Sequence, residues 1–120
     1  MKIMVVDDSA AMRMMVKRML KIAGFQGHDV VEAADGAEAL DKIRNDKPDL
    51  VLSDWNMPNM TGMELLTALN EENIRLNFGF VTTESTQAMR DAVEEAGAKF
   101  LIAKPFTEES VTEALQPFLP

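Results

Sequence analysis

Short apolar runs alternate with helix-like patterns five times along this sequence. The first run, Lys2–Val6, is the continuous hydrophobic stretch expected of a strand that is buried on both faces of a sheet. Apolar residues then recur at helical spacing from Met12 to Ala23, and Gly24 provides a stop signal. The same criteria predict four further strands: His28–Ala33, Asp49–Ser53, Leu76–Val81 and Ala98–Ala103.

Helix start signals lie between these runs. Asp35 and Glu38 have the spacing of a capping box, in which a side chain at the helix start and a second one three residues later bond each other's backbone N–H groups. Thr61 and Glu64 repeat this spacing before the next helix, and a last helix begins after Thr107. Regular strand–helix alternation with short connections predicts an α/β domain, in which helices cover both faces of a parallel sheet.

Methionine occurs ten times in the chain, mostly in two places. Met12, Met15 and Met19 lie at helical spacing in the first predicted helix, so we expect them to pack into the core. Met57 and Met60 lie in a polar loop after the third strand, where packing and contact with a partner protein are equally open.

The length and composition describe one globular domain. The chain has 120 residues, of which 47% are hydrophobic and 27% charged, so we expect a single domain over residues 1–120. The absence of cysteine excludes disulfides and thiolate metal sites. The N-terminal run meets two acids too soon for a signal peptide, and no apolar stretch approaches the roughly 20 residues of a membrane helix. The sequence therefore predicts a cytoplasmic protein that does not enter a membrane.

The net charge of −8 limits the possible partners. Nucleic-acid binding is driven largely by clustered lysine and arginine residues, which release counter-ions. The basic residues gather in one short segment, with a spacing typical of the solvated face of a helix: Arg13, Lys17, Arg18 and Lys21. We therefore expect no direct nucleic-acid binding by this domain, whereas its acidic surface suits a divalent cation.

Four of the predicted strands lead directly into residues that carry a charge or a hydroxyl group. Asp7 and Asp8 come after the first strand, and Asp54 comes after the third. Thr82 follows the fourth strand and Lys104 follows the fifth. In an open parallel sheet, ligands bind beyond the carboxyl ends of the strands. These side chains are therefore expected to form a candidate site at that edge.

Three carboxylates at one edge require a counter-charge. Two carboxylates about 4 Å apart repel each other by about 4 kcal/mol at an effective dielectric of 20. A hard dication removes this conflict, and magnesium accepts oxygen ligands while keeping water positions that a phosphate oxygen can take. Zinc is disfavoured, because the sequence has no cysteine and its one histidine, His28, lies on another strand. We therefore predict Mg²⁺ as the cofactor.

The same group of side chains has the chemistry needed to accept a phosphoryl group. A carboxylate can act as a nucleophile and hold a phosphoryl group as an acyl phosphate. Transfer requires charge neutralisation on the phosphoryl oxygens, which Lys104 and a dication would supply, and Thr82 offers a hydroxyl group. Each feature alone also fits ordinary structure, since acidic pairs often cap helices and Lys-Pro often forms a turn. Their joint occurrence at one edge favours a phosphoryl acceptor at Asp54.

Two other functions fit the same fold class. An aspartyl-phosphate phosphatase usually carries its nucleophile and acid on one strand end in an Asp-x-Asp pattern, whereas here the acid pair is adjacent and Asp54 follows another strand. A nucleotide- or flavin-binding module needs a glycine-rich phosphate loop after the first strand, and the segment VVDDSAAM contains no glycine. Both alternatives are less favoured than a phosphoryl-accepting switch.

Four segments of the sequence, VVDDS, SDWNMPNMTG, VTTE and AKPF, together resemble the receiver domain of two-component response regulators, and most of all the stand-alone chemotaxis type. The resemblance extends from Lys2 to Leu119. It implies a flavodoxin-like, doubly wound α/β fold, with a five-stranded parallel sheet in the order 2-1-3-4-5 and five helices. It also implies a signalling switch that is not a turnover enzyme. Its partners would be a histidine kinase or phosphotransfer protein and a downstream target protein.

The resemblance also assigns roles to individual residues. Asp54 would accept the phosphoryl group from a phosphohistidine of the kinase. Asp8 and Asp54 would bind magnesium through their side chains. Asp7 would bind the ion through a water molecule, and Asn56 would bind it through its backbone carbonyl. Lys104 would contact the phosphoryl group.

Further positions would control the switch and its lifetime. The resemblance implies that Thr82 moves toward the phosphoryl group and that the Lys104–Pro105 peptide bond is cis. Asn56 and Glu84 lie two residues past the acceptor and the threonine, at positions that in the family set how fast water removes the phosphoryl group. This pair is similar to that of the chemotaxis type, so we expect comparatively rapid self-dephosphorylation.

The sequence departs from the family at one position of the fifth strand. Receivers commonly carry an aromatic residue there that turns inward when the threonine moves, but here that place is Leu101, with Phe100 beside it. We therefore expect backbone shifts around residues 82–84 to relay the output. The last helix has acids but no arginine, which argues against the charged dimer interface of receivers joined to DNA-binding domains. We expect a monomer.

Overall fold

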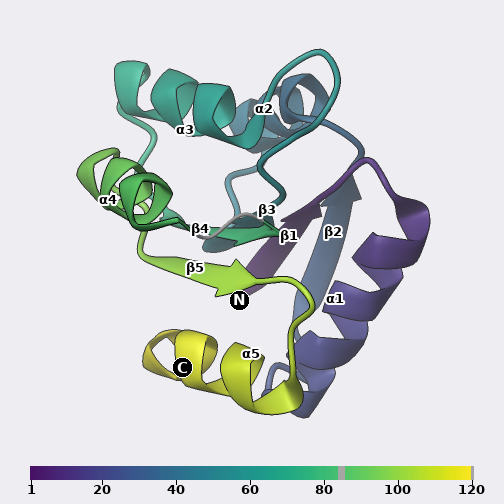
Figure 1. Cartoon of the computed structure of the whole chain (residues 1–120). Coiled ribbons are helices and arrows are strands. Elements are labelled where there is room, and N and C mark those ends of the chain that lie inside the picture. Colours follow the sequence, from purple (N-terminus) through teal and green to yellow (C-terminus); the bar gives the residue numbers. More distant parts are fainter. Residues whose placement is uncertain (84–85, 120) are drawn as a thin grey trace.

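The computed structural model describes residues 1–83 and 86–119, in which strands and helices alternate along the chain (Figure 1). The strands are β1 (Lys2–Val6), β2 (Asp29–Ala33), β3 (Leu50–Ser53), β4 (Asn77–Thr82) and β5 (Phe100–Ala103). The helices are α1 (Ala10–Ile22), α2 (Gly36–Asn45), α3 (Gly62–Glu71), α4 (Gln87–Glu95) and α5 (Glu108–Leu115), with a short 3₁₀ helix, η1 (Gln116–Phe118), after α5. The predicted element order is confirmed.

The strands form one parallel sheet in the order β2-β1-β3-β4-β5. This is the doubly wound arrangement that the sequence resemblance implied. Val6 at the end of β1 lies beside Ala33 of β2 and Ser53 of β3, and Thr82 at the end of β4 lies beside Ala103 of β5. The residues that follow β1, β3, β4 and β5 therefore emerge at the same edge of the sheet.

Helices cover both faces of the sheet (Figure 1). Helices α1 and α5 pack on one face, and α2, α3 and α4 pack on the other. Successive residues of a strand point to opposite faces: Ile3 belongs to the core cluster under α1 and α5, and Met4 belongs to the cluster under α2 and α3. Both faces of the central strands are thus buried from solvent, which explains why these strands appear in the sequence as unbroken apolar runs.

The predicted helix starts are formed by side-chain caps. The Thr61 hydroxyl accepts a hydrogen bond from the Glu64 N–H at 3.2 Å, and a Glu64 carboxylate oxygen accepts one from the Thr61 N–H at 3.0 Å. This is a complete capping box. At α2 only half of the box forms, because Asp35 accepts from the Glu38 N–H at 2.8 Å while the Glu38 side chain accepts from the Ala34 N–H instead.

The expectation that three methionines of the first helix pack into the core was wrong in part. Met15 is 47% exposed, because the buried stripe of α1 runs through Val16 and Leu20 and leaves Met15 on the solvent side. The last α-helix ends at Leu115, although the apolar residues Phe118 and Leu119 continue its helical spacing in the sequence. Pro117 explains this end, because proline lacks the N–H group that would continue the hydrogen bonds of the α-helix, and the chain goes on as the short η1. Each described helix is too short or too polar to cross a bilayer.

Candidate functional site

The carboxyl edge of the sheet is extended by one residue beyond three of its strands. The backbone N–H of Asp7 donates to Ala33 O at 3.1 Å, that of Asp54 donates to Val6 O at 2.9 Å, and that of Lys104 donates to Thr82 O at 2.7 Å. These bonds continue the parallel ladders, so the sheet itself fixes the starting positions of the three charged side chains.

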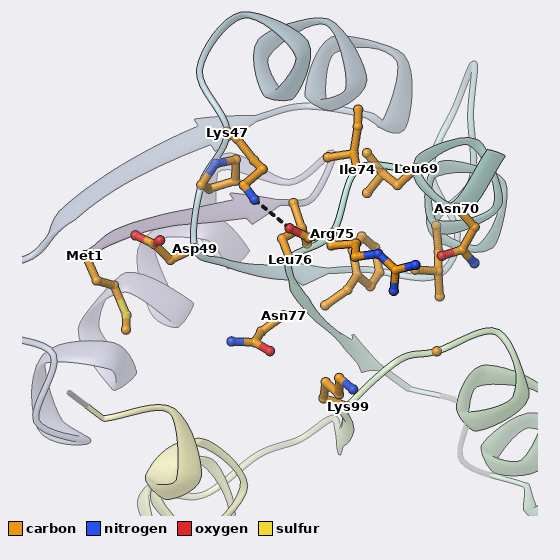
Figure 2. Close-up of a pocket in the computed structure, with 14 residues that line it drawn as sticks. Met1, Lys47, Asp49, Leu69, Asn70, Ile74, Arg75, Leu76, Asn77 and Lys99 are labelled. Atoms are coloured by element: carbon orange, nitrogen blue, oxygen red, sulfur yellow. Dashed lines mark hydrogen bonds between the residues drawn. The ribbon is translucent and has the colours of Figure 1, made fainter. Parts of the chain in front are cut away.

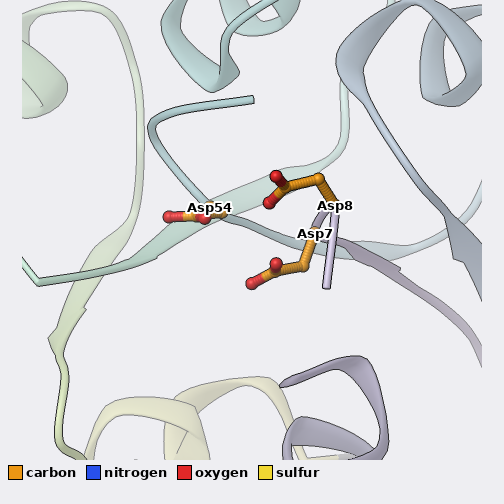
Figure 3. Close-up of side chains that lie close together, drawn as sticks. All are labelled: Asp7, Asp8 and Asp54. Atoms are coloured by element: carbon orange, nitrogen blue, oxygen red, sulfur yellow. The ribbon is translucent and has the colours of Figure 1, made fainter. Parts of the chain in front are cut away.

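Asp7, Asp8 and Asp54 form an acidic cluster, in which one carboxylate oxygen from each residue lies within 4.8 Å of the others (Figure 3). Asp7 is buried, Asp54 is half-buried and Asp8 is exposed. At this spacing two full charges repel by about 3 kcal/mol at an effective dielectric of 20. All the donors are hard oxygen atoms that come from two adjacent strands, which fits a hard divalent cation such as Mg²⁺. The cluster can therefore hold a metal ion.

Lys104 supplies a cation on the other side of these acids. Its ammonium nitrogen lies 3.2 Å from Asp7 Oδ2 and 3.5 Å from Asp54 Oδ1. The side chain of Lys104 is only 10% exposed, so both interactions are weakly screened by water. One ammonium cannot balance three carboxylates, and the cluster keeps an excess of negative charge.

Burial and charge act in opposite directions on Asp54. Burial raises the pKa of the Asp54 carboxyl above its ordinary value, and the negative charge of Asp7 adds to that rise. The ammonium of Lys104 and the Trp55 N–H, which donates to Asp54 Oδ1 at 2.8 Å, oppose the shift in pKa. The net shift is upward, so a proton competes with a cation for this carboxylate more strongly than at an exposed aspartate.

The backbone around Asp54 is packed against the start of α3. The Gly62 N–H donates to Trp55 O at 2.9 Å, and the Ser53 hydroxyl donates to Asp54 O at 2.9 Å. A Cβ atom at Gly62 would lie 2.2 Å from Asp54 O and 2.8 Å from the Phe80 ring. Only glycine leaves room for this approach, which holds the acceptor residue between β3 and α3.

Arg13, on α1, binds the backbone of Asp7 in the acidic cluster, a contact that the sequence did not predict. Its guanidinium donates to Asp7 O at 2.6 Å and to a Glu32 carboxylate oxygen at 2.9 Å. Lys17 also binds Glu32, at 3.2 Å, and together these two cations lower the Glu32 pKa. The basic segment of α1 is therefore only partly a solvated face. Because Arg13 lies on one strand–helix unit and Glu32 on the next, sequence spacing gave no signal of this contact.

Two further predicted residues lie around the same edge. Thr82 is buried at the end of β4, and Asn56 is exposed in the loop after Asp54. Glu84 lies outside the described residues. The Lys104–Pro105 peptide bond is cis, as the resemblance implied.

The position of the family aromatic is aliphatic in this fold. Leu101 packs against the core under α3 and α4, in register with Phe80 of β4. Phe100 points to the opposite face, where its ring lies 5.5 Å from that of Phe118. Phe100 therefore does not substitute for an aromatic residue at position 101.

A surface groove of about 760 Å³ lies at the opposite, amino edge of the sheet (Figure 2). It is lined by residues next to the starts of β3, β4 and β5 and contains none of the predicted site residues. Its Lys47 ammonium is bound to Arg75 O at 2.7 Å, and its Asp49 carboxylate accepts from the Lys2 N–H at 2.8 Å. The candidate chemistry therefore lies at the carboxyl edge.

Comparison with known proteins agrees with this geometry. Residues 3–116 match the family model for the response regulator receiver domain. The chain belongs to this receiver family. It is 37% identical over 119 residues to the chemotaxis protein CheY of Pseudomonas aeruginosa, covering 97% of this chain and 94% of that protein. It is also 37% identical over 118 residues to CheY of Bacillus subtilis, covering 98% of this chain and 97% of that protein.

A solved structure supports the same relationship. The chemotaxis protein CheY4 of Vibrio cholerae matches with a TM-score of 0.84 and 36% identity, covering 98% of each chain. As a receiver of this type, the chain has a role in two-component signal transduction, and its family is one of signalling switches. The family relationship does not favour the phosphatase or the nucleotide-binding alternative.

Proposed function

We propose that this receiver accepts a phosphoryl group on Asp54 in a magnesium-dependent reaction and changes conformation to alter the binding of a downstream protein. The donor is a histidine kinase or a phosphotransfer protein that carries a phosphohistidine. The observation that carries this proposal is the position of Asp54 between an acidic cluster that fits a dication and the Lys104 ammonium, 3.5 Å away.

Each residue of the site has a separate role in phosphoryl transfer. A carboxylate oxygen of Asp54 attacks the phosphorus, a P–O bond forms, and the P–N bond to the donor imidazole breaks with the electron pair going to the imidazole. Asp8 and Asp54 would hold Mg²⁺ directly, Asp7 would hold it through water, and the Asn56 carbonyl would complete the protein donors. Bound Mg²⁺ supplies positive charge to the phosphoryl oxygens. Lys104 neutralises a further share of that charge.

The switch and its reversal depend on neighbouring residues. Thr82 lies at the end of β4, beside β5, and its hydroxyl donates a hydrogen bond to a phosphoryl oxygen after transfer. Output is relayed by backbone shifts around residues 82–84, since Leu101 occupies the usual aromatic position. Asn56 and Glu84 set the rate at which water removes the phosphoryl group, and this self-dephosphorylation is rapid.

The domain organisation, location and partners of the chain are also part of the proposal. We propose that residues 1–120 act as a single receiver domain, monomeric and cytoplasmic, that interacts with proteins. A net charge of −8 opposes binding to nucleic acid. It also opposes adsorption to anionic membrane surfaces.

The test uses the one tryptophan of the chain, which follows Asp54 directly. Trp55 emission is recorded while Mg²⁺ is added, and then beryllofluoride, which imitates a phosphoryl group on a carboxylate. We expect a saturable change at each addition, and no beryllofluoride response in Asp54→Ala. An unresponsive native chain, or an Asp54→Ala variant that responds to beryllofluoride as the native chain does, would contradict the proposal.

A further inference from the structure

Two contacts fasten the loop between β3 and α3 to the start of α2. The Asn59 side-chain amide donates to Asp35 Oδ2 at 2.8 Å. The Gly36 N–H donates to Met60 O at 3.1 Å. Because Asp35 and Gly36 follow β2 while the loop follows β3, these contacts join segments from strands that are not neighbours in the sheet.

Asp35 divides its two carboxylate oxygens between the helix and the loop. Oδ1 accepts from the Glu38 N–H at 2.8 Å and caps α2, and Oδ2 accepts from Asn59. The Glu38 N–H and then the Asn59 amide lower the pKa of Asp35, so the carboxylate keeps its charge to a lower pH than an ordinary aspartate does. The contact is therefore a charge-assisted hydrogen bond, which is stronger than a bond between neutral groups.

The backbone on both sides of the contact is suited to it. Asn59 has a φ of 67°, in the left-handed region that asparagine tolerates better than most residues. A Cβ atom at Gly36 would lie 2.6 Å from Met60 O, so the two segments approach this closely only because residue 36 is glycine. The contact between the loop and α2 is thus favoured by the side-chain hydrogen bond, by the left-handed backbone of Asn59 and by the absence of a Cβ atom at Gly36.

The fastened loop is the one that carries Asn56. At its beginning the loop is held by the Trp55 N–H, which donates to Asp54, and by Gly62, which donates to Trp55 O. At its far side it is held by Asn59. Asn56 is exposed between these two fixed points. The place of its backbone carbonyl thus depends on both.

We propose that Asp35 and Asn59 are positioning residues for the metal site, because their bond holds the loop so that the Asn56 carbonyl can join the carboxylate donors. This inference rests on the proposed function, since it assumes that the acidic cluster binds Mg²⁺. Partners that orient the ligands of a metal commonly change its affinity by about 10–100-fold when they are removed. The bond lies outside the donor set and touches no reacting atom.

Two variants break the bond in different ways. Asn59→Gly removes the amide and keeps a residue that accepts the left-handed backbone. Asp35→Ser keeps one oxygen to cap α2 and removes the second oxygen that Asn59 needs. Asn73→Gly is the matched control, because Asn73 also has a positive φ, of 55°, but lies beyond the far end of α3.

The measurement is the Mg²⁺ dissociation constant from Trp55 emission, together with the thermal midpoint of the metal-free protein. We expect Asn59→Gly and Asp35→Ser each to weaken Mg²⁺ binding about tenfold. The double variant should bind Mg²⁺ no more weakly than either single variant, because both substitutions remove the same hydrogen bond. Asn73→Gly should bind Mg²⁺ like the native chain, whatever the size of its change in thermal midpoint.

Four results would overturn the inference or its basis. Native Mg²⁺ affinity in both loop variants would contradict it, as would equal weakening in Asn73→Gly. Fully additive losses in the double variant would show that the two residues act separately. No saturable Mg²⁺ response in the native chain would instead contradict the proposed function, and this inference would fall with it.

Discussion

Lys104 is bonded to Asp7, with 3.2 Å between Nζ and Oδ2, although the two residues are 97 positions apart in the chain. Their side chains are 10% and 6% exposed, so this is a nearly buried ion pair. Asp7 follows β1 and Lys104 follows β5, and two further strands lie between them in the sheet. The ion pair therefore spans the carboxyl ends of β3 and β4, and Asp54 lies at the end of β3. It places the cation beside the proposed acceptor before any phosphoryl group arrives.

Replacing Lys104 by methionine should slow phosphoryl uptake by about 10²-fold, the usual loss when one preorganised charge partner of a transition state is removed. Methionine keeps much of the side-chain length and removes the charge. The measurement is the time course of phosphorylation by a small acyl phosphate in excess Mg²⁺. Lys99→Met is the control, since Lys99 is exposed at the opposite edge. Equal rates in the two variants would contradict the role of Lys104.

Replacing Asp54 by asparagine should stabilise the metal-free protein by about 1 kcal/mol, because it removes one of three crowded carboxylates. Mg²⁺ should reverse the order of stability. At 100 times its dissociation constant, a ligand that binds only the folded state adds about 2.7 kcal/mol to the free energy of unfolding, and the variant should gain much less. Urea unfolding with and without Mg²⁺ measures both effects. Equal Mg²⁺ stabilisation of the two proteins would show that the ion binds elsewhere.

The affinity for Mg²⁺ should rise with pH as Asp54 loses its proton. The pKa of Asp54 is raised above 3.8 in the folded protein, so the metal-free folded state binds more protons than the unfolded state between 3.8 and the raised value. The contribution of this group to metal-free stability is present below 3.8 and is lost as pH rises through the folded pKa. Mg²⁺ titrations across this range should tighten with pH in the native chain. A profile that is unchanged in Asp54→Asn would assign the titration to another group.

Replacing Gly62 by alanine should destabilise the fold by about 2–3 kcal/mol, as expected when an atom is inserted into packed structure. The added Cβ would meet Asp54 O at 2.2 Å, and neither backbone segment can move away freely. Alanine is the better helix former by about 1 kcal/mol, so a loss would identify the clash as the cause. Gly27→Ala is the comparison, because Gly27 has a φ of 81° but no atom within 4 Å of the added Cβ. Chemical denaturation should show the larger loss at Gly62.

The sequence predicted which charged side chains meet at the carboxyl edge, because that edge is formed by strand ends. Lys2–Val6 and the other two central strands are buried on both faces, which made their ends visible in the sequence. Parallel pairing then brings Asp7, Asp54 and Lys104 to one edge, whatever the detailed packing. The strand order came from the resemblance alone, because hydrophobic periodicity says nothing about which strands pair.

Contacts between separate strand–helix units were beyond the reach of sequence patterns. The bonds from Arg13 to Asp7 O and from Asn59 to Asp35 depend on how neighbouring units are rotated against each other. The exposure of Met15 has a similar origin, since a small rotation of α1 decides which of two adjacent residues faces the sheet. Local rules on capping and periodicity contain none of this information.

The central claim, that Asp54 is the phosphoryl acceptor, is tested most directly by locating the modification. The native chain is incubated with a small acyl phosphate and Mg²⁺, treated with borohydride to convert an aspartyl phosphate to homoserine, and digested for peptide mass spectrometry. We predict homoserine at position 54, dependent on Mg²⁺ and absent in Asp54→Ala. Homoserine at position 7 or 8 in place of position 54, or no conversion of the native chain, would contradict the account.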